Sequence, residues 1–214
     1  MSKLVIFDLD GTILDTLTDL KTSVNYTLKL KGYQEKTLEE IKKFLGNGIE
    51  KLMRRSLPSD IDEKEFQECF HIFKAHYEKN LQNETKPYPE IIEVMTKIRE
   101  KGYKIAVVSN KFQAGVNELI NKFFSGLVDI AVGLSENIKA KPDPSAIYYV
   151  FEKLDIKDLN DVFFVGDSEV DIETARNANI KIISVTWGFR SIGELKLLNP
   201  DYLVNNPKEL LNIL

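Results

Sequence analysis

Cysteine and histidine are scarce in this chain of 214 residues, which has one cysteine and two histidines. A single cysteine cannot form a disulfide within the chain, so Cys69 fits a reducing compartment. It lies in EFQECFHIF, an apolar face at helical spacing, and we expect it to fill the core rather than act as a nucleophile. His71 and His76 have no cluster of cysteine, histidine or aspartate beside them, so we expect ordinary surface or core side chains rather than metal ligands.

Long apolar runs and an excess of basic charge are missing too. No apolar stretch reaches the ~18 residues that a membrane span needs, and the apolar run near the N-terminus is too short and too acidic for a signal peptide. The net charge is −4 and no lysine–arginine cluster dominates, so nothing indicates binding to nucleic acid or to an anionic membrane. We therefore expect a cytoplasmic protein whose partner is a small molecule, since a small anion needs only a local positive site. The sequence does not distinguish a monomer from a homodimer.

The length and composition are those of an ordinary globular protein. Hydrophobic residues make up 43% of the chain and charged residues 29%, which argues against disorder. At about 150 residues per domain, the length allows one sizeable domain or a domain with an insertion. No internal repeat or low-complexity segment is present.

Residues 3–15 read KLVIFDLDGTILD, and the rest of the chain is organised around them. The unbroken apolar run at 4–7 predicts a strand buried on both faces, as in a parallel sheet. Asp8 and Asp10 follow on the same side of the extended chain, and Gly11 lets the chain turn sharply. Like charges held so close are costly unless a cation joins them or one stays protonated. The pair therefore favours Mg²⁺ as a cofactor.

Helical patterns dominate the segment that follows. Asp15 or Thr16 is a candidate N-cap for the first helix. The stretches with apolar residues at helical spacing are 17–31, 37–45, 49–57 and 62–83. Together they predict a helical block.

Strand patterns return after KPYPE at residues 86–90, whose two prolines break the helical pattern. From there apolar runs of strand length alternate with helical stretches, which indicates a parallel sheet. Because the first strand belongs to the same sheet, the helical block is an insertion. We predict an α/β fold: a doubly wound, Rossmann-like parallel sheet as the core domain, at 1–15 and 85–214, with an α-helical cap domain at 16–84 that closes on substrate.

Four short segments, each after a predicted strand, resemble the motifs of the haloacid dehalogenase superfamily, whose members are mostly phosphatases. DLDGT at 8–12 resembles the first motif and SNK at 109–111 the second. Lys141, in KPDP, resembles the third, and GDSEVD at 166–171 the fourth. The resemblance covers essentially the whole chain, because members with a helical cap inserted after the first motif share its organisation.

The resemblance implies a reaction through a phosphorylated aspartate. Asp8 would attack phosphorus, and Asp10 would protonate the leaving alcohol and then deprotonate the attacking water. Mg²⁺ would be held by Asp8, by Asp10 through its backbone carbonyl, and by Asp167. The groups that would meet the phosphate are Thr12, Ser109, Asn110 and Lys141.

Several of these residues also have structural explanations. Ser168 or Asp171 could cap the helix predicted at its own position, and Asp171 could instead be a metal ligand through water or a partner of Lys141. Lys139 is the neighbouring rival of Lys141 and could be a plain surface charge. Phe189 could line the entrance to the site, but an aromatic residue beside a glycine is expected to pack.

The predicted cap holds the candidate substrate contacts. Residues 44–57, FLGNGIEKLMRRSL, resemble the cap loop of phosphoglycolate phosphatases. Gly46, Asn47 and Gly48 lie at a helix start, where free N–H groups could meet an anion, although a plain turn explains the glycines equally well. Arg54 is a candidate partner for a substrate carboxylate.

The overall pattern implies a Mg²⁺-dependent phosphatase of the phosphoglycolate phosphatase type that acts on a small phosphorylated metabolite. A β-phosphoglucomutase-like mutase is an alternative, but those enzymes carry an arginine where this chain has Ile49, and DGV where it has DGT. Pyrophosphatases and nucleotide phosphatases share every core motif. Asp10 disfavours a dehalogenase, whose first motif lacks the second acid. A metabolite-binding protein without turnover is an alternative of another class.

Overall fold

The computed structural model describes residues 3–214, and its centre is the strand β1 (Leu4–Phe7). All four side chains of β1 are buried, as the unbroken apolar sequence predicts. Strands β4 (Lys104–Phe112) and β6 (Val162–Gly166) pair with it in parallel, one on each side. Because each fully buried aliphatic or aromatic side chain contributes about 1.5–3 kcal/mol, this strand anchors the sheet.

Within the described residues the parallel sheet has six strands in the order β5-β4-β1-β6-β7-β8. The outer strands are β5 (Ile130–Leu134), β7 (Lys181–Val185) and β8 (Tyr202–Val204). The chain leaves β1 toward β4 and β5 and then returns to the other side of β1 for β6. Open α/β sheets bind ligands beyond the carboxyl ends of the strands at such a reversal. The sheet order therefore points to the end of β1.

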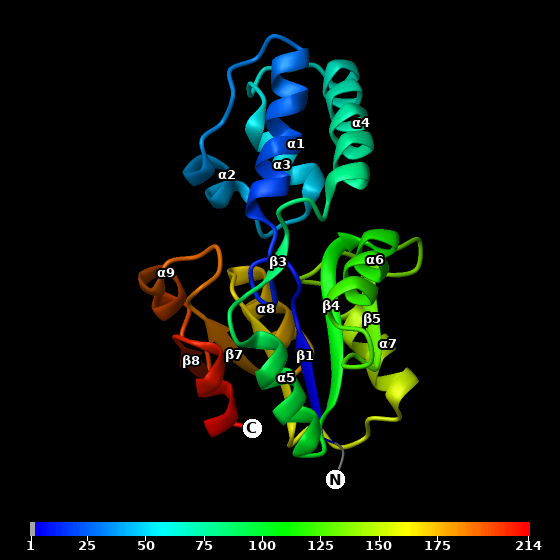
Figure 1. Ribbon diagram of the computed structural model, residues 1–214, viewed down its shortest axis with the longest axis vertical. Coiled ribbons are helices and arrows are strands. Elements are labelled where there is room, and N and C mark those ends of the chain that lie inside the picture. The colour runs from blue at the N-terminus through cyan, green and yellow to red at the C-terminus, as the bar shows by residue number, and fades with distance from the viewer. Residues whose placement is uncertain (1–2) are drawn as a thin grey trace.

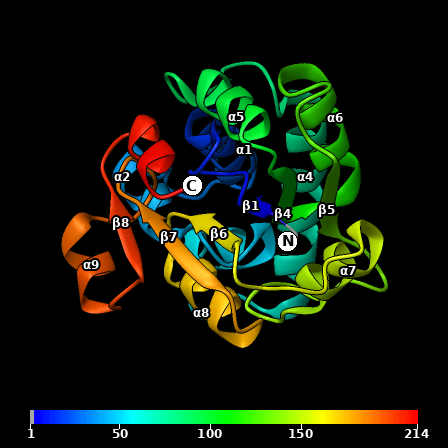
Figure 2. The ribbon, with the colours of Figure 1, turned by 90° about the horizontal axis from the view of Figure 1, so that it is seen from below.

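Helices cover both faces of the sheet (Figure 2), as in a doubly wound fold. Val5 and Phe7 face a core shared with α5 (Ile91–Glu100) and α6 (Gln113–Phe123). Leu4 and Ile6 face a second core, against α7 (Ser145–Leu154) and α8 (Glu169–Asn177). The chain then adds α9 (Ile192–Leu197) and a 3-10 helix, η1 (Pro207–Asn212).

The inserted segment forms four helices that stand beyond the carboxyl ends of the strands (Figure 1). They are α1 (Leu17–Leu30), α2 (Leu38–Phe44), α3 (Ile49–Ser56) and α4 (Glu63–Asn80). Thr37 and Asp62 cap α2 and α4 by accepting hydrogen bonds from backbone N–H groups three residues on. We call α1–α4, with the loops that connect them, the helical lobe and the rest of the described chain the sheet lobe.

The structure shortens one predicted helix of the helical lobe and decides between the two candidate caps of another. The helix expected at 62–83 ends at Asn80. Thr16 occupies the N-cap position of α1 but makes no capping hydrogen bond with its side chain; Asp15 instead accepts one from the Leu17 N–H at 3.3 Å. The short Asp15 side chain competes for this N–H because it lies two residues upstream, the spacing of an Asx turn.

The chain passes between the lobes through a short antiparallel ribbon. Strand β2 (Leu14–Asp15) leads into the helical lobe and pairs with β3 (Lys86–Pro87), which leads out of it. The buried carboxylate of Asp19 fastens the same junction by accepting hydrogen bonds from the N–H groups of Glu84 and Thr85 and from the Thr85 hydroxyl. The predicted domain boundaries fall beside this ribbon, and the division into two domains stays a prediction.

Cys69 and His76, from the two scarce residue types, both pack within the helical lobe. Cys69 is fully buried in α4, and burial raises the pKa of its thiol. His76 contacts the Ser23 hydroxyl at 3.0 Å and stacks on Tyr26, with ring centroids 4.1 Å apart. Among residues 3–214, no helix has the length and apolar character needed to cross a membrane.

Candidate active site

The turn after β1 brings the first pair of acids to the end of the sheet. Gly11 makes this turn with a φ of 89°, in the region that favours glycine. A Cβ on Gly11 would lie 2.6 Å from Oδ2 of Asp167, so no side chain fits there. The missing side chain lets the acid that follows β6 approach the acids that follow β1.

Asp8 is joined to a buried lysine and a second acid. Lys141 Nζ lies 2.8 Å from Oδ1 of Asp8 and 2.6 Å from Oδ1 of Asp171. Burial alone would lower the pKa of Lys141, but the two carboxylates more than offset it, so its pKa is raised and the ammonium is retained. Burial raises the pKa of Asp8 well above its usual range; Lys141 opposes this rise, and Asp171 and Asp167 add to it.

Asp171 holds Lys141 and the turn after β6 at the same time. Its Oδ2 accepts hydrogen bonds from the Ser168 hydroxyl at 2.7 Å and from the Ser168 N–H at 3.1 Å, while its Oδ1 faces Lys141. Both carboxylate oxygens are thus engaged within the protein. Two of the three roles that the sequence left open for Asp171 are therefore present together: it is a partner of Lys141, and it caps α8 by accepting from the Ser168 N–H.

The residues that end β4 support the same lysine. Asn110 accepts a hydrogen bond from the Lys141 N–H at 2.7 Å and donates one to the Lys141 carbonyl at 3.2 Å. Ser109 lies beside it, buried, and its hydroxyl accepts from the Lys111 N–H. Both side chains line the cavity described below, so their predicted contacts with a phosphate stay predictions.

Asp167 is clamped from two sides. Its Oδ1 accepts from the Thr12 hydroxyl at 3.1 Å, and its Oδ2 accepts from the Phe189 N–H at 2.7 Å. Burial, with Asp171 adding, raises the pKa of Asp167 to about 7. The Thr12 side chain is fully buried against this carboxylate, so its predicted contact with a phosphate stays a prediction.

Three buried carboxylates could hold a metal ion. One oxygen from each of Asp8, Asp167 and Asp171 lies within 4.8 Å of the other two. The raised pKa values of Asp8 and Asp167 reflect burial and mutual repulsion, which a divalent cation would relieve. Hard oxygen donors suit Mg²⁺. Asp171 and Asp167 are each engaged on both oxygens, by Lys141 and Ser168 and by Thr12 and Phe189 respectively. The preference for Asp8 and Asp167 as ligands therefore comes from the family resemblance.

Asp10 faces a second buried lysine, which the sequence analysis did not assign. Lys111 Nζ lies 3.0 Å from Oδ1 of Asp10 and donates a hydrogen bond to the hydroxyl of Tyr77 on α4. Burial alone would lower the pKa of Lys111, but Asp10 and Tyr77 more than offset it, so its pKa is raised. Burial raises the pKa of Tyr77 to about 12, which keeps the phenol neutral.

These groups surround a cavity of about 40 Å³ between the lobes, a volume for a few water molecules or one small polar group. From the sheet lobe it is lined by Asp8, Asp10, Ser109, Asn110, Lys111, Lys141, Asp167, Ser168 and Phe189. From the helical lobe it is lined by Leu20, Leu45, Gly46, Gly48 and Ile49. The sheet lobe therefore supplies the charged groups of the cavity, and the helical lobe supplies mostly apolar surface.

The cap loop is only partly at the cavity. Gly46 and Gly48 line it, with φ of 109° and 87°. The Asn47 side chain instead accepts a hydrogen bond from Arg55 at 2.7 Å. Arg54 lies away from the cavity: its guanidinium pairs with Glu63 at 3.1 Å and stacks on a phenylalanine ring. Its predicted role as a substrate partner finds no support in this arrangement.

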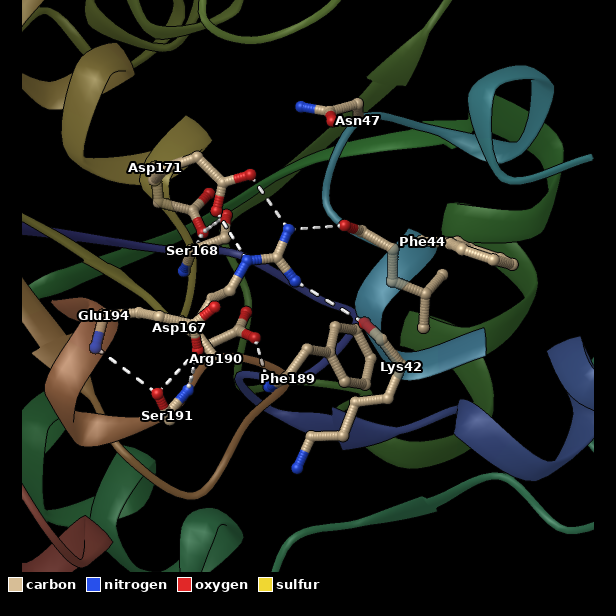
Figure 3. A network of polar contacts seen from close by, with 12 residues as sticks. Lys42, Phe44, Asn47, Asp167, Ser168, Asp171, Phe189, Arg190, Ser191 and Glu194 are labelled. Atoms are coloured by element: carbon tan, nitrogen blue, oxygen red, sulfur yellow. Dashed lines mark hydrogen bonds and ion pairs between the residues drawn. The ribbon is translucent and has the colours of Figure 1, made fainter. Parts of the chain in front are cut away.

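Arg190, in the loop after β7, links the sheet lobe to the cap loop (Figure 3). Its guanidinium binds both carboxylate oxygens of Glu169, at 2.7 and 2.9 Å, and donates to the backbone carbonyl of Leu45 at 2.7 Å. The carbonyl of Lys42 lies 3.5 Å away. Arg190 thus satisfies free carbonyls at the C-terminal end of α2, where a positive charge is favourable.

Three residues at the site were missed by sequence reasoning or left open. Lys111 was within the quoted second motif, and a lysine directly after two polar residues at a strand end is the signal that was available. Phe189 was left open and proves to line the cavity as well as to bind Asp167. Arg190 carries no local signal, because its partners lie 21 and about 145 residues away.

The chain is similar in sequence to known proteins over most of its length. A family model described as haloacid dehalogenase-like hydrolase matches residues 5–185. A phosphoglycolate phosphatase of Nitrosospira multiformis is 35% identical over 94% of this chain and 91% of its own length. A phosphoglycolate phosphatase of Aquifex aeolicus is 30% identical over 99% of this chain and 96% of its own.

The three-dimensional structure is similar to a solved structure as well. The crystal structure of a predicted phosphoglycolate phosphatase from Haemophilus somnus superimposes with a TM-score of 0.91 at 29% identity. The match covers 99% of this chain and 97% of that one. Both the sheet and the inserted helices are therefore shared.

Proposed function

The chain belongs to the haloacid dehalogenase-like hydrolases, and from this premise we propose that it is a phosphatase that hydrolyses a small phosphate monoester through a phosphorylated Asp8. The observation that carries the proposal is the contact of Asp8 with Lys141 at 2.8 Å in the small cavity between the lobes. A carboxylate there can act as a nucleophile, and a retained ammonium can neutralise charge on it and on an entering phosphate.

Asp8 forms the bond to phosphorus while the bond from phosphorus to the ester oxygen breaks. Lys141 holds Asp8 from one side, and Asp171 and Asn110 hold Lys141 in place through its side chain and its backbone. Phosphoryl transfer depends mainly on such positioning and on neutralisation of charge. The network supports a fixed nucleophile rather than a mobile one.

Asp10 is proposed as the proton donor to the leaving alcohol and then as the base that takes a proton from the attacking water. Its side chain is 20% exposed, against 11% for Asp8, and it lines the same cavity. General acid–base catalysis of this kind contributes about 10²- to 10⁴-fold. A carboxyl group two residues beyond the nucleophile is on the correct side of the turn for this step.

Asp8 and Asp167 are the proposed side-chain ligands of Mg²⁺, with the backbone carbonyl of Asp10 as the third protein ligand that the family resemblance implies. When bound, the ion supplies charge neutralisation that lets an anionic nucleophile approach an anionic phosphate. The Thr12 hydroxyl and the Phe189 N–H fix the orientation of Asp167.

The proposed substrate is 2-phosphoglycolate or a phosphate ester of similar size. Two relatives at 35% and 30% identity are phosphoglycolate phosphatases, and a cavity of about 40 Å³ leaves little room beyond a phosphate group. Ile49 lines that cavity where mutases of this type carry an arginine, so a second phosphate gains no charged partner there. The cytoplasm is the proposed compartment, in line with the buried lone cysteine.

A phosphate-release screen tests the proposal. The purified chain is incubated with Mg²⁺ and a panel of small phosphate esters, including 2-phosphoglycolate, nucleoside monophosphates, pyrophosphate and β-glucose 1-phosphate. We expect the highest kcat/KM for an ester of two or three carbons, and loss of activity on chelation that Mg²⁺ restores. Full activity in chelator, or isomerisation of glucose phosphate without phosphate release, would contradict it.

A further inference from the structure

The second buried lysine is not used by the proposed mechanism, although it lies in the same cavity. Lys111 has a side chain only 1% exposed, and an ammonium so deeply buried needs partners to remain charged. Its partners come from different lobes: Asp10 from the turn after β1 and Tyr77 from α4. The ammonium therefore lies between the proposed acid and the helical lobe.

Tyr77 is held rigidly at its own end of this contact. It is fully buried, its ring stacks on Phe73 with centroids 5.7 Å apart, and Phe112 packs against it edge-on at 6.5 Å. Aromatic pairs in these arrangements are favourable beyond simple burial. The Tyr77 ring is therefore fixed relative to α4. Its hydroxyl can hold Lys111 only while α4 lies against the sheet lobe.

We propose that Lys111 and Tyr77 are positioning residues for Asp10, so that its carboxyl group is correctly placed for proton transfer only when the helical lobe is closed. This inference rests on the proposed function of Asp10. Lys111 restrains the carboxyl oxygen at 3.0 Å, and Tyr77 restrains Lys111. Closing the lobe therefore positions the acid at the same time as it covers the cavity.

The contact could instead serve only stability, or Lys111 could bind an anionic group of the substrate. Each role predicts a different dependence on the substrate. A positioning role matters only when the leaving group needs a proton. An anion-binding role matters only when the group esterified to phosphate already carries a negative charge in the bound substrate. A structural role lowers every rate equally.

Three small substrates separate these roles, measured as kcat/KM in Lys111→Met and Tyr77→Phe. Acetyl phosphate releases a stable carboxylate that needs no proton, 2-hydroxyethyl phosphate releases a neutral alcohol, and 2-phosphoglycolate releases an alcohol that bears a carboxylate. We expect Lys111→Met to lose about 100-fold on both alcohol esters, the low end of general acid catalysis, and less than about 5-fold on acetyl phosphate. Tyr77→Phe keeps the ion pair, so its kcat/KM on the two alcohol esters should fall only about 10-fold, which corresponds to the loss of one hydrogen bond to a charged group. Its kcat/KM on acetyl phosphate should again change little.

The covalent intermediate gives a second readout. With acetyl phosphate, Lys111→Met should form phosphorylated Asp8 at near-normal rate but hydrolyse it slowly, because water activation by Asp10 is impaired. Intact-mass spectrometry should therefore find a larger phosphorylated fraction than in the unmodified enzyme. Equal losses on all three substrates without accumulation, or a loss confined to 2-phosphoglycolate, would overturn the inference.

Two controls keep the result interpretable. Tyr33→Phe removes another tyrosine hydroxyl of the helical lobe, one that donates to Glu65 away from the cavity, and should leave all three rates unchanged. Thermal unfolding shows whether Lys111→Met is folded; if it is not, Tyr77→Phe alone decides. Absence of turnover in the unmodified enzyme would refute the proposed function, whereas an active enzyme with uniform losses refutes only the positioning role.

Discussion

The two lobes contribute to the cavity in different ways. The sheet lobe supplies carboxylates and lysines that are buried and bound to one another, as Asp8, Lys141 and Asp171 are. The helical lobe supplies mostly apolar side chains and glycine backbone, such as Leu20, Ile49 and the cap loop. We infer that changes in the sheet lobe abolish the reaction, whereas changes in the helical lobe alter which substrate binds and when the cavity is closed.

The largest effect is expected from Asp8→Asn, which keeps the shape of the nucleophile and removes its charge. Activity should fall about 10⁴-fold or more, since removing the nucleophile of a covalent mechanism removes most of its catalysis. Initial rates with 2-phosphoglycolate measure it. Asp155→Asn is the matched control, because this carboxylate is 79% exposed and lies outside the cavity; it should have wild-type rates. Substantial turnover by Asp8→Asn would remove the nucleophile assignment.

Lys141→Met should come next and should affect stability as well as rate. It leaves Asp8 and Asp171 without their buried counter-charge, and breaking such a pair costs about 3–5 kcal/mol of unfolding free energy. We expect kcat to fall about 10³-fold. Denaturant unfolding and steady-state kinetics measure the two effects. Lys139→Met, at an 81% exposed side chain, should change neither; an equal effect at Lys139 would mean that the wrong lysine was chosen.

Arg190→Lys should have an intermediate effect, because it weakens the contact between the lobes and leaves the reacting groups in place. Lysine keeps the charge but cannot bind Glu169 and the Leu45 carbonyl with one planar group. We expect KM to rise about 10-fold, which corresponds to the loss of one hydrogen bond to a charged group. The value of kcat should stay within about 2-fold of that of the unmodified enzyme. A fall in kcat with unchanged KM would place Arg190 in the chemistry instead.

The smallest effect is expected from Arg54→Ala in the helical lobe. This guanidinium is 44% exposed and pairs with Glu63 on the surface, a type of contact worth about 0–1 kcal/mol. Neither kcat nor KM for 2-phosphoglycolate should change more than about 2-fold. A large rise in KM would restore Arg54 as a substrate partner and would mean that the lobe moves on binding.

The sequence predicted well what local patterns determine. An apolar run, two acids at alternate positions and a glycine are enough to predict β1 and its turn, and the alternation of later strands and helices predicts the parallel sheet. What it could not predict depends on contacts between distant segments. Lys111 owes its place to a tyrosine 34 residues away, and Arg190 to carbonyls of the other lobe. Thr12 illustrates the limit within a motif, because its hydroxyl faces Asp167 across 155 residues.

The ribbon between the lobes has a consequence for how such a chain can be rebuilt. Asp15 and Lys86 stand directly opposite each other in it, so the whole excursion through four helices begins and ends at one cross-strand pair. Two antiparallel strands facing in this way can be joined by a two-residue turn. The helical insert can therefore be exchanged or removed at the Asp15–Lys86 pair, and the register of the parallel sheet should not change.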